Sequence, residues 1–257
     1  MNTIVDPFKN WPIVSNVTAI DDEERGCTVY TASHDVEIDF SQQTGWFDPN
    51  KYVGGVTIIG AGGIGCNVAF ELLTMGVKDI TLYDHDDVEP HNLASQKAYR
   101  LVDLGKPKVR ALARLLLEYG ADTVTVYQRR FTGDDVITTP LVIGAVDSMA
   151  SRQLIWDAIT NSPNVQFYLD GRLNKQTAQI CAVEPFDPDW YTKTWLFPDE
   201  MAPTDATCTM RTVVFPATAM AAIMCRHISR WFLGQPVVQF AQFDLDEFAL
   251  TVYGDIE

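Results

Sequence analysis

Apolar positions between residues 56 and 183 follow two spacings in alternation. Short runs rich in Val, Ile and Leu predict buried strands at 56–59, 79–83, 124–127, 141–143 and 165–169. Between them, apolar residues three and four positions apart predict helices at 64–75, 107–119 and 149–159. This alternation predicts an α/β fold with a Rossmann-like, doubly wound and mainly parallel sheet. The polar residues that follow its strands are expected to meet at one edge of the sheet.

Two segments flank this alternation. Residues 28–32 and 36–40 are short apolar stretches separated by Ser33, His34 and Asp35, a pattern that predicts a β-hairpin. We therefore expect an N-terminal extension over 1–52 that contains this hairpin, followed by one domain over 53–257. That domain is expected to include a strand at 177–183, a proline-rich crossover loop at 184–215, a helix at 217–232 and C-terminal strands.

The run Gly-Ala-Gly-Gly-Ile-Gly at 60–65 joins the first of these strands to the first helix. Gly60, Gly62 and Gly65 allow a tight turn, a close approach of phosphate to the backbone and close packing of helix on strand. Gly63 removes one more side chain, and the amides at the helix N-terminus would face an anion. Glycine turns also occur without a ligand, but the strand and helix on either side favour a nucleotide-phosphate site.

Asp84 lies nineteen positions after Gly65 and is expected to accept a hydrogen bond from a ribose hydroxyl. This arrangement suits NAD as well as ATP, so it leaves the nucleotide open. Further polar candidates follow at Asp86, Asn92, Gln96, Lys108 and Asp147. Three of them have a structural alternative. Lys108, in a first helical turn, is also compatible with a solvated surface lysine, Asp147 with a helix cap and Asn92 with a turn residue.

Composition limits the partners. A net charge of -15 argues against nucleic acid, because phosphate backbones select basic surfaces. The acidity either favours a basic partner protein or only keeps the chain soluble. No apolar run reaches the roughly 18 residues of a membrane span, and no charged-then-apolar leader opens the chain. We therefore expect a cytoplasmic protein that binds neither membrane nor nucleic acid.

The five cysteines include no CxxC pair and no paired metal-ligand spacing, so neither a zinc site nor a disulfide framework is expected. Cys66, Cys181 and Cys225 fall within predicted helices or strands and are expected to pack inside. His85 and His91 flank the acidic loop at a spacing that matches no zinc pattern. We interpret both histidines as loop residues.

The segments YDHDDVEPHNLASQ, at 83–96, and LGKPKV, at 104–109, carry a family resemblance. They resemble the ThiF-like adenylating family, which includes the ubiquitin-activating enzymes and the enzymes that activate sulfur-carrier proteins. In that family GxGGxG precedes D-x-D-x-V-x-x-x-N-L-x-R-Q, a Pro-Lys pair that opens a helix, and an aspartate after an apolar strand. The matching residues here are Asp84, Asp86, Val88, Asn92, Leu93, Gln96, Pro107, Lys108 and Asp147. The resemblance covers residues 56–235.

This resemblance implies ATP- and Mg²⁺-dependent adenylation of the C-terminal carboxylate of a small ubiquitin-like or sulfur-carrier protein that ends in Gly. It implies that Asp84 holds the ribose, that Asn92 and Lys108 contact the phosphates and that Asp147 binds Mg²⁺. Asp86 and Gln96 belong to the same nucleotide site by the same resemblance. The family commonly dimerises, so a homodimer is expected.

Two arginines that serve the ATP phosphates in typical members are not recognisable. Ser95 stands where the family has an arginine before the glutamine, and the arginine-bearing N-terminal arm is also missing from the pattern. Either Arg100, Arg110 or Arg152 replaces them, or transition-state stabilisation is weaker.

Residues 208–216 resemble the C-T-x-x-x-F-P segment of ubiquitin-activating enzymes, with a longer spacing before the phenylalanine. Cys208, with Arg211 close by, is therefore expected to be a catalytic nucleophile that forms a thioester after adenylation. A buried, inert cysteine is the alternative.

Three other functions stay open. A catalytically weak or inactive ThiF-like partner subunit is favoured by the missing arginines. An NAD-dependent oxidoreductase is compatible with the glycine turn, but it leaves Lys108 and Asp147 without roles. Adenylation of a small molecule, an RNA base or a peptide is the third, and the acidic composition argues against RNA.

Overall fold

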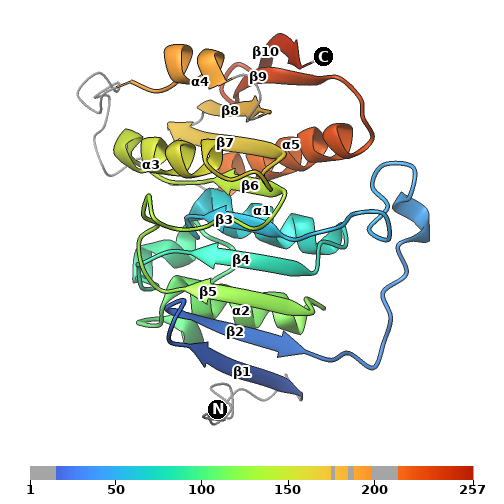
Figure 1. The fold of residues 1–257 in the computed structure, drawn as a ribbon, viewed down its shortest axis with the longest axis vertical. Coiled ribbons are helices and arrows are strands. Elements are labelled where there is room, and N and C mark those ends of the chain that lie inside the picture. Colours follow the sequence, from blue (N-terminus) through green and yellow to red (C-terminus); the bar gives the residue numbers. More distant parts are fainter. Residues whose placement is uncertain (1–15, 175–176, 185–187, 198–213, 257) are drawn as a thin grey trace.

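The computed structural model describes residues 16–174, 177–184, 188–197 and 214–256. These residues contain one ten-stranded sheet in the order β1-β2-β5-β4-β3-β6-β7-β8-β9-β10 (Figure 1). Its five central strands are parallel: β3 (Val56–Ile59), β4 (Asp79–Tyr83), β5 (Thr123–Tyr127), β6 (Leu141–Gly144) and β7 (Phe167–Asn174). The chain winds outward from β3 in both directions, so the predicted doubly wound α/β fold is confirmed.

The outer strands are antiparallel. On one side β1 (Val17–Asp22) pairs with β2 (Cys27–Ala32), and β2 pairs with β5. On the other side β7 is followed by β8 (Thr177–Val183), β9 (Val237–Asp244) and β10 (Ala249–Ile256). The strands β1 and β2 extend the same sheet as the central strands. The predicted boundary between an N-terminal extension and the domain, after residue 52, stays a prediction.

The N-terminal hairpin and its strand at 28–32, observed as β2, are confirmed, but the prediction of its second strand at 36–40 is wrong. The strand before 28–32, not the one after it, is its partner, and Gly26, with a φ of 64°, lies in the turn between them. Residues 36–40 form no strand. The segment after β2 instead runs along the end of a helix, where the His34 ring Nε2 lies 2.9 Å from the carbonyl oxygen of Ala121.

Helices cover both faces of the sheet (Figure 1). One face carries α1 (Gly63–Thr74), α2 (Lys108–Glu118) and α5 (Val214–Phe232), whose apolar residues form the larger core with the strands. The other face carries α3 (Met149–Thr160) and α4 (Pro188–Thr194), around a smaller core that includes Trp156, Tyr168 and Tyr191. Among the described residues, no helix combines the length and apolar character that a bilayer crossing requires.

The helix α4 lies within 184–215, where the sequence predicts a crossover loop, so that prediction is wrong for 188–194. A helix of two turns is too short to show an apolar period. It is held against the sheet by Tyr191, which is fully buried with its ring centroid 4.6 Å from that of Trp156, and by Thr192, whose hydroxyl accepts from Trp156 Nε1 at 3.1 Å. The rest of the segment, 198–213, lies outside the described residues.

Candidate nucleotide site

The glycine turn between β3 and α1 has no room for side chains at two positions and open space at a third. Gly60 has a φ of 98°, which L-residues rarely adopt, and a Cβ there would collide with the carbonyl oxygen of Ala145. A Cβ on Gly65 would collide with the carbonyl oxygen of Gly60. A Cβ on Gly62 would meet no atom within 4 Å. The turn is therefore tight at its base and open above Gly62, as a phosphate site requires.

The N-terminus of α1 opens into this space. Gly62 is the N-cap, and the first helical hydrogen bond runs from the Cys66 amide to the Gly62 carbonyl at 3.0 Å. The amides of the first turn, including that of Gly63, precede this bond and have no acceptor within the helix. Together with the helix dipole they form a site for an anion.

Two side chains hold the backbone of Ala61, the residue before Gly62. Asp84 Oδ2 accepts from the Ala61 amide at 2.7 Å, and the Tyr99 hydroxyl donates to the Ala61 carbonyl at 2.5 Å. Asp84 Oδ1 accepts from the Asp86 amide at 2.8 Å. The carboxylate that the sequence assigns to a ribose thus also fixes the turn. Tyr99 was missed by the sequence analysis, because a tyrosine in a polar loop carries no signal of a partner 38 residues away.

Lys108 and Asp86 form an ion pair beside this turn. Lys108 Nζ lies 2.8 Å from Asp86 Oδ2, and the lysine side chain is only 8% exposed. The alternative of a solvated surface lysine is therefore wrong. Partial burial raises the pKa of Asp86, but the hydrogen bond and charge of Lys108 outweigh it, with help from His85 and Arg130, and hold that pKa below its ordinary value. Arg130 follows β5 and was not among the sequence candidates.

Asn92 and Gln96 lie in the connection from β4 to α2, where residues Pro90–Ala94 form a 3-10 helix. Asn92 is buried, and its Oδ1 accepts from the Glu89 amide at 2.8 Å, so it does act as a turn residue. Gln96 is also buried, and its Oε1 has no hydrogen-bond partner among the described residues. A buried acceptor of this kind is one that a ligand donor satisfies.

Asp147 lies at the same edge of the sheet, on the connection from β6 to α3. The Ala145 amide donates to the Ile59 carbonyl at 2.8 Å, which ties this connection to the end of β3. Ser148, not Asp147, caps α3, since its Oγ accepts from the Ser151 amide. The alternative that Asp147 is a helix cap is therefore wrong. Its exposed carboxylate forms no hydrogen bond or ion pair in the part of the chain that the structure describes.

The residues at this edge fit a nucleotide with a divalent cation. Asp147 offers a free carboxylate, the hard oxygen ligand that Mg²⁺ takes alongside substrate phosphates. Asp84, His85 and Asp86 also bring one ligand atom each within 4.8 Å of one another. However, both carboxylates there are already engaged, that of Asp84 by the Ala61 amide and that of Asp86 by Lys108.

The arginines proposed to replace the family pair are mostly engaged elsewhere. Arg100 Nη1 lies 3.5 Å from Glu118 Oε2, on α2. Arg110 is half-buried and its charge acts on Tyr30 of β2. Arg152 is buried, with Nε 2.9 Å from Asp170 Oδ1.

The cysteines within the described residues are buried and free: Cys27, Cys66, Cys181 and Cys225. Burial raises the pKa of Cys66 to about 12 and that of Cys181 well above its ordinary value. The expectation that Cys66, Cys181 and Cys225 pack inside is confirmed. Cys208, the expected nucleophile, lies outside the described residues.

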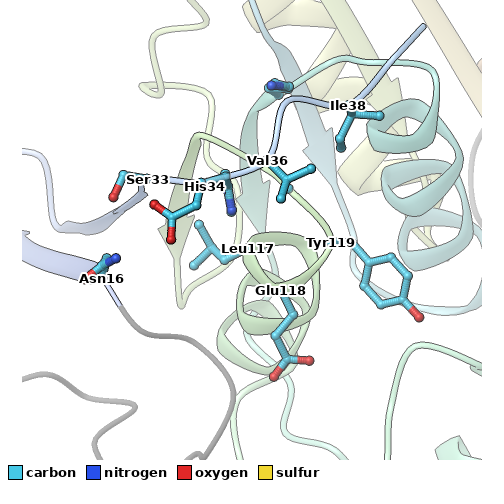
Figure 2. A pocket seen from close by; sticks show the side chains of 11 residues that line it. Asn16, Ser33, His34, Val36, Ile38, Leu117, Glu118 and Tyr119 are labelled. Atoms are coloured by element: carbon cyan, nitrogen blue, oxygen red, sulfur yellow. The ribbon is translucent and has the colours of Figure 1, made fainter.

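A hollow of about 320 Å³ lies elsewhere on the molecule (Figure 2). The segment after β2, with His34 and Val36, forms one wall, and the end of α2, with Leu117 and Tyr119, forms the other. Lys78, which precedes β4, also lines it. The hollow thus lies at the amino ends of the parallel strands, opposite the edge with the glycine turn, and is separate from the nucleotide site.

This chain matches only part of the length of its relatives. The adenylyltransferase and sulfurtransferase MOCS3 of Dictyostelium discoideum is 35% identical over 117 residues, 43% of this chain and 28% of that protein. The NEDD8-activating enzyme E1 catalytic subunit of Arabidopsis thaliana is 36% identical over 63 residues, 24% of this chain and 14% of that protein. The chain therefore spans less than a third of either relative.

Solved structures show the same fold. A structure of PaaA superposes with a TM-score of 0.63 at 19% identity, over 79% of this chain and 64% of that one. E. coli MccB with ATP superposes with a TM-score of 0.58 at 20% identity, over 78% and 63%. In sequence, the model of the ThiF family matches residues 54–252, most of the chain. The chain belongs to the ThiF family.

Proposed function

We propose that this chain binds ATP with Mg²⁺ and adenylates the C-terminal carboxylate of a small ubiquitin-like or sulfur-carrier protein or of a peptide. One observation carries the proposal. Three hydrogen bonds in series connect a buried cation to the open phosphate turn: Lys108 Nζ to Asp86, the Asp86 amide to Asp84, and the Ala61 amide to Asp84, at 2.8, 2.8 and 2.7 Å. The series fixes the cation relative to the α1 N-terminus before any ligand binds.

The reaction joins two anions. A carboxylate oxygen of the substrate forms a bond to the α-phosphorus of ATP, and the bond from that phosphorus to the oxygen bridging to the β-phosphate breaks. Pyrophosphate leaves with the electron pair. Catalysis then rests on positioning and charge neutralisation.

The residues divide these tasks. The α1 amides above Gly62 would donate to phosphate oxygens, and Lys108 would add a compact cation. Asp147 would hold Mg²⁺, which when bound neutralises charge on the phosphates. Each oxygen of Asp84 keeps a further lone pair for a ribose hydroxyl. Asn92 and Gln96 complete the site in this proposal.

Names of relatives support the substrate class. One relative is called an adenylyltransferase and sulfurtransferase, another a NEDD8-activating enzyme, and one similar structure contains MccB with ATP. By the same proposal, the Cys208 thiolate then attacks the acyl carbon of the adenylate, the bond from that carbon to the AMP oxygen breaks, and AMP leaves with the electron pair as the thioester forms. The chain works as a homodimer in the cytoplasm in this proposal.

A weak or inactive partner subunit is the second candidate. The engagement of Arg100 with Glu118 and of Arg152 with Asp170 favours it, because neither guanidinium is left for the phosphates.

Exchange of labelled pyrophosphate into ATP tests the proposal, with carrier proteins and peptides ending in Gly added one at a time. We expect exchange only with a carboxylate substrate. Asp147→Ala should abolish it, while Cys208→Ala and Asp134→Ala, a control at another exposed aspartate, should retain it. ATP binding without exchange under any substrate would favour the inactive subunit, and no ATP binding would overturn both candidates.

A further inference from the structure

Arg152 bonds to the backbone on both sides of Asp147. The guanidinium, 4% exposed as a residue, donates from Nη2 to the Val146 carbonyl at 2.5 Å and from Nη1 to the Ser148 carbonyl at 3.3 Å. These carbonyls belong to the residues directly before and after Asp147. One planar, rigid donor group therefore holds the peptide group that leads into Asp147 and the carbonyl of the residue after it, which together restrict the direction of the Asp147 side chain.

Asp170, in β7, holds Arg152 in place. Its Oδ1 accepts from Arg152 Nε at 2.9 Å, and Arg152 Nη2 also donates to the Gly171 carbonyl at 3.1 Å. Complete burial alone would raise the pKa of Asp170, but the charges of Arg152 and Arg172 outweigh it and keep that pKa below its ordinary value. The carboxylate thus stays ionised and keeps its strong, charge-assisted bond to Arg152.

The second oxygen of Asp170 reaches the segment around α4. Oδ2 accepts from Arg172 Nη2 at 3.0 Å, from the Tyr191 hydroxyl at 3.0 Å and from Trp195 Nε1 at 3.1 Å. Tyr191 lies in α4, and Trp195 follows it directly. One buried carboxylate therefore connects this segment to the Asp147 connection through Arg152.

We propose that Arg152, oriented by Asp170, is a positioning residue that presents the Asp147 carboxylate to the divalent cation on the nucleotide. This inference rests on the proposed function. It also gives Arg152 a different task from the phosphate contact that the sequence suggested, because its donors are directed to Asp170 and to backbone carbonyls. Partners that orient a metal ligand from behind typically change metal affinity by about 10- to 100-fold when mutated.

The test measures nucleotide binding rather than turnover. A fluorescent ATP analogue is titrated with excess EDTA and again with saturating Mg²⁺, for the wild type, Arg152→Lys, Asp147→Ala and the double variant. Lysine keeps the charge of Arg152 but lacks the planar fork of donors. We expect Arg152→Lys to leave the ATP-analogue affinity in EDTA within about twofold of the wild type. It should reduce the increase in affinity on adding Mg²⁺ by about tenfold, and Asp147→Ala should do the same. The double variant should lose no more of this Mg²⁺-dependent affinity than Asp147→Ala alone.

Arg114→Lys is the matched control. Arg114 is also a buried arginine on a helix, with Nη2 2.9 Å from the buried carboxylate of Asp103, but it bonds to neither neighbour of Asp147. Arg114→Lys should lower thermal stability about as much as Arg152→Lys. It should not change the increase in ATP-analogue affinity that Mg²⁺ produces. If Arg152→Lys lost the same ATP-analogue affinity with and without Mg²⁺, or if the affinity losses of the two single variants added up in the double variant, the inference would be overturned. The proposed function would not be affected by either result. A wild type without Mg²⁺-dependent ATP binding would overturn the proposed function as well.

Discussion

Lys108 Nζ and Asp86 Oδ2 lie 2.8 Å apart, with 8% of the lysine side chain and 48% of the aspartate side chain exposed. The ammonium is thus held inside the edge of the sheet while its counter-ion faces water. Because water screens the exposed carboxylate, Asp86 orients the Lys108 ammonium but only partly neutralises its charge. A cation arranged in this way needs little reorganisation when an anionic ligand binds.

The stability that this pair provides depends on pH. Burial raises the pKa of Asp86, but Lys108 outweighs it and the net pKa is lowered. An aspartate with a lowered folded-state pKa stabilises fully above its unfolded pKa and loses this effect as pH falls through the folded pKa. We expect the stability difference between wild type and Asp86→Asn to be present at pH 7 and to shrink as the pH falls below about 4. Urea unfolding measures it, and a difference independent of pH would contradict the pairing.

Two alanine substitutions in the glycine turn should separate folding from binding. In Gly62→Ala the new methyl group enters open space, so stability should change by no more than about 1 kcal/mol while ATP binding is lost. In Gly65→Ala it meets the Gly60 carbonyl, and we expect a cost of about 3 kcal/mol or more. Thermal unfolding and ATP titration of both variants test this. Unchanged ATP affinity in Gly62→Ala would place the phosphates elsewhere.

Tyr99→Phe should loosen the turn. It removes the hydroxyl that donates to the Ala61 carbonyl at 2.5 Å and leaves that buried acceptor unpaired, at a cost of about 1–3 kcal/mol. Because Ala61 precedes Gly62, ATP affinity should fall as well. Tyr52→Phe is the control, since the Tyr52 hydroxyl donates to the Gly55 carbonyl at 2.9 Å, before β3. Chemical denaturation with ATP titration compares them, and equal ATP affinity in both variants would refute the role of Tyr99.

Alkylation at neutral pH should spare the described cysteines. Burial raises the pKa of Cys27, Cys66, Cys181 and Cys225, so each presents little thiolate. If Cys208 is the nucleophile, a short pulse of iodoacetamide on the native chain should label it first. Peptide mass spectrometry locates the label. Faster labelling of any of the other four than of Cys208 would argue against its proposed role.

Local signals made the phosphate turn predictable from the sequence. An apolar strand, closely spaced glycines and a helical period stand next to one another in β3 and α1, so no distant contact was needed to predict this part. The second strand of the hairpin was mispredicted because Val36, Ile38 and Phe40 alternate as a strand does. They follow a path over the end of α2 instead, where a Cβ on Gly120 would lie 2.8 Å from Ile38 Cδ1.

The rest of the site depends on contacts between residues far apart in the sequence, which the sequence alone does not show. The sequence left Arg100, Arg110 and Arg152 as equal candidates, because it does not show that Arg152 meets Asp170 across α3 and β7. In the same way, the bond between Asp84 and the Ala61 amide depends on β4 lying beside β3. Pairings of this kind arise only once the sheet has formed.

A crystal structure of the chain with a nonhydrolysable ATP analogue and Mn²⁺ tests the central claim most directly, because anomalous scattering locates the metal. The account predicts phosphate oxygens within hydrogen-bond distance of the amides above Gly62 and of Lys108 Nζ, with the metal bound by Asp147. A nucleotide bound away from the α1 N-terminus, or a metal held without Asp147, would contradict it.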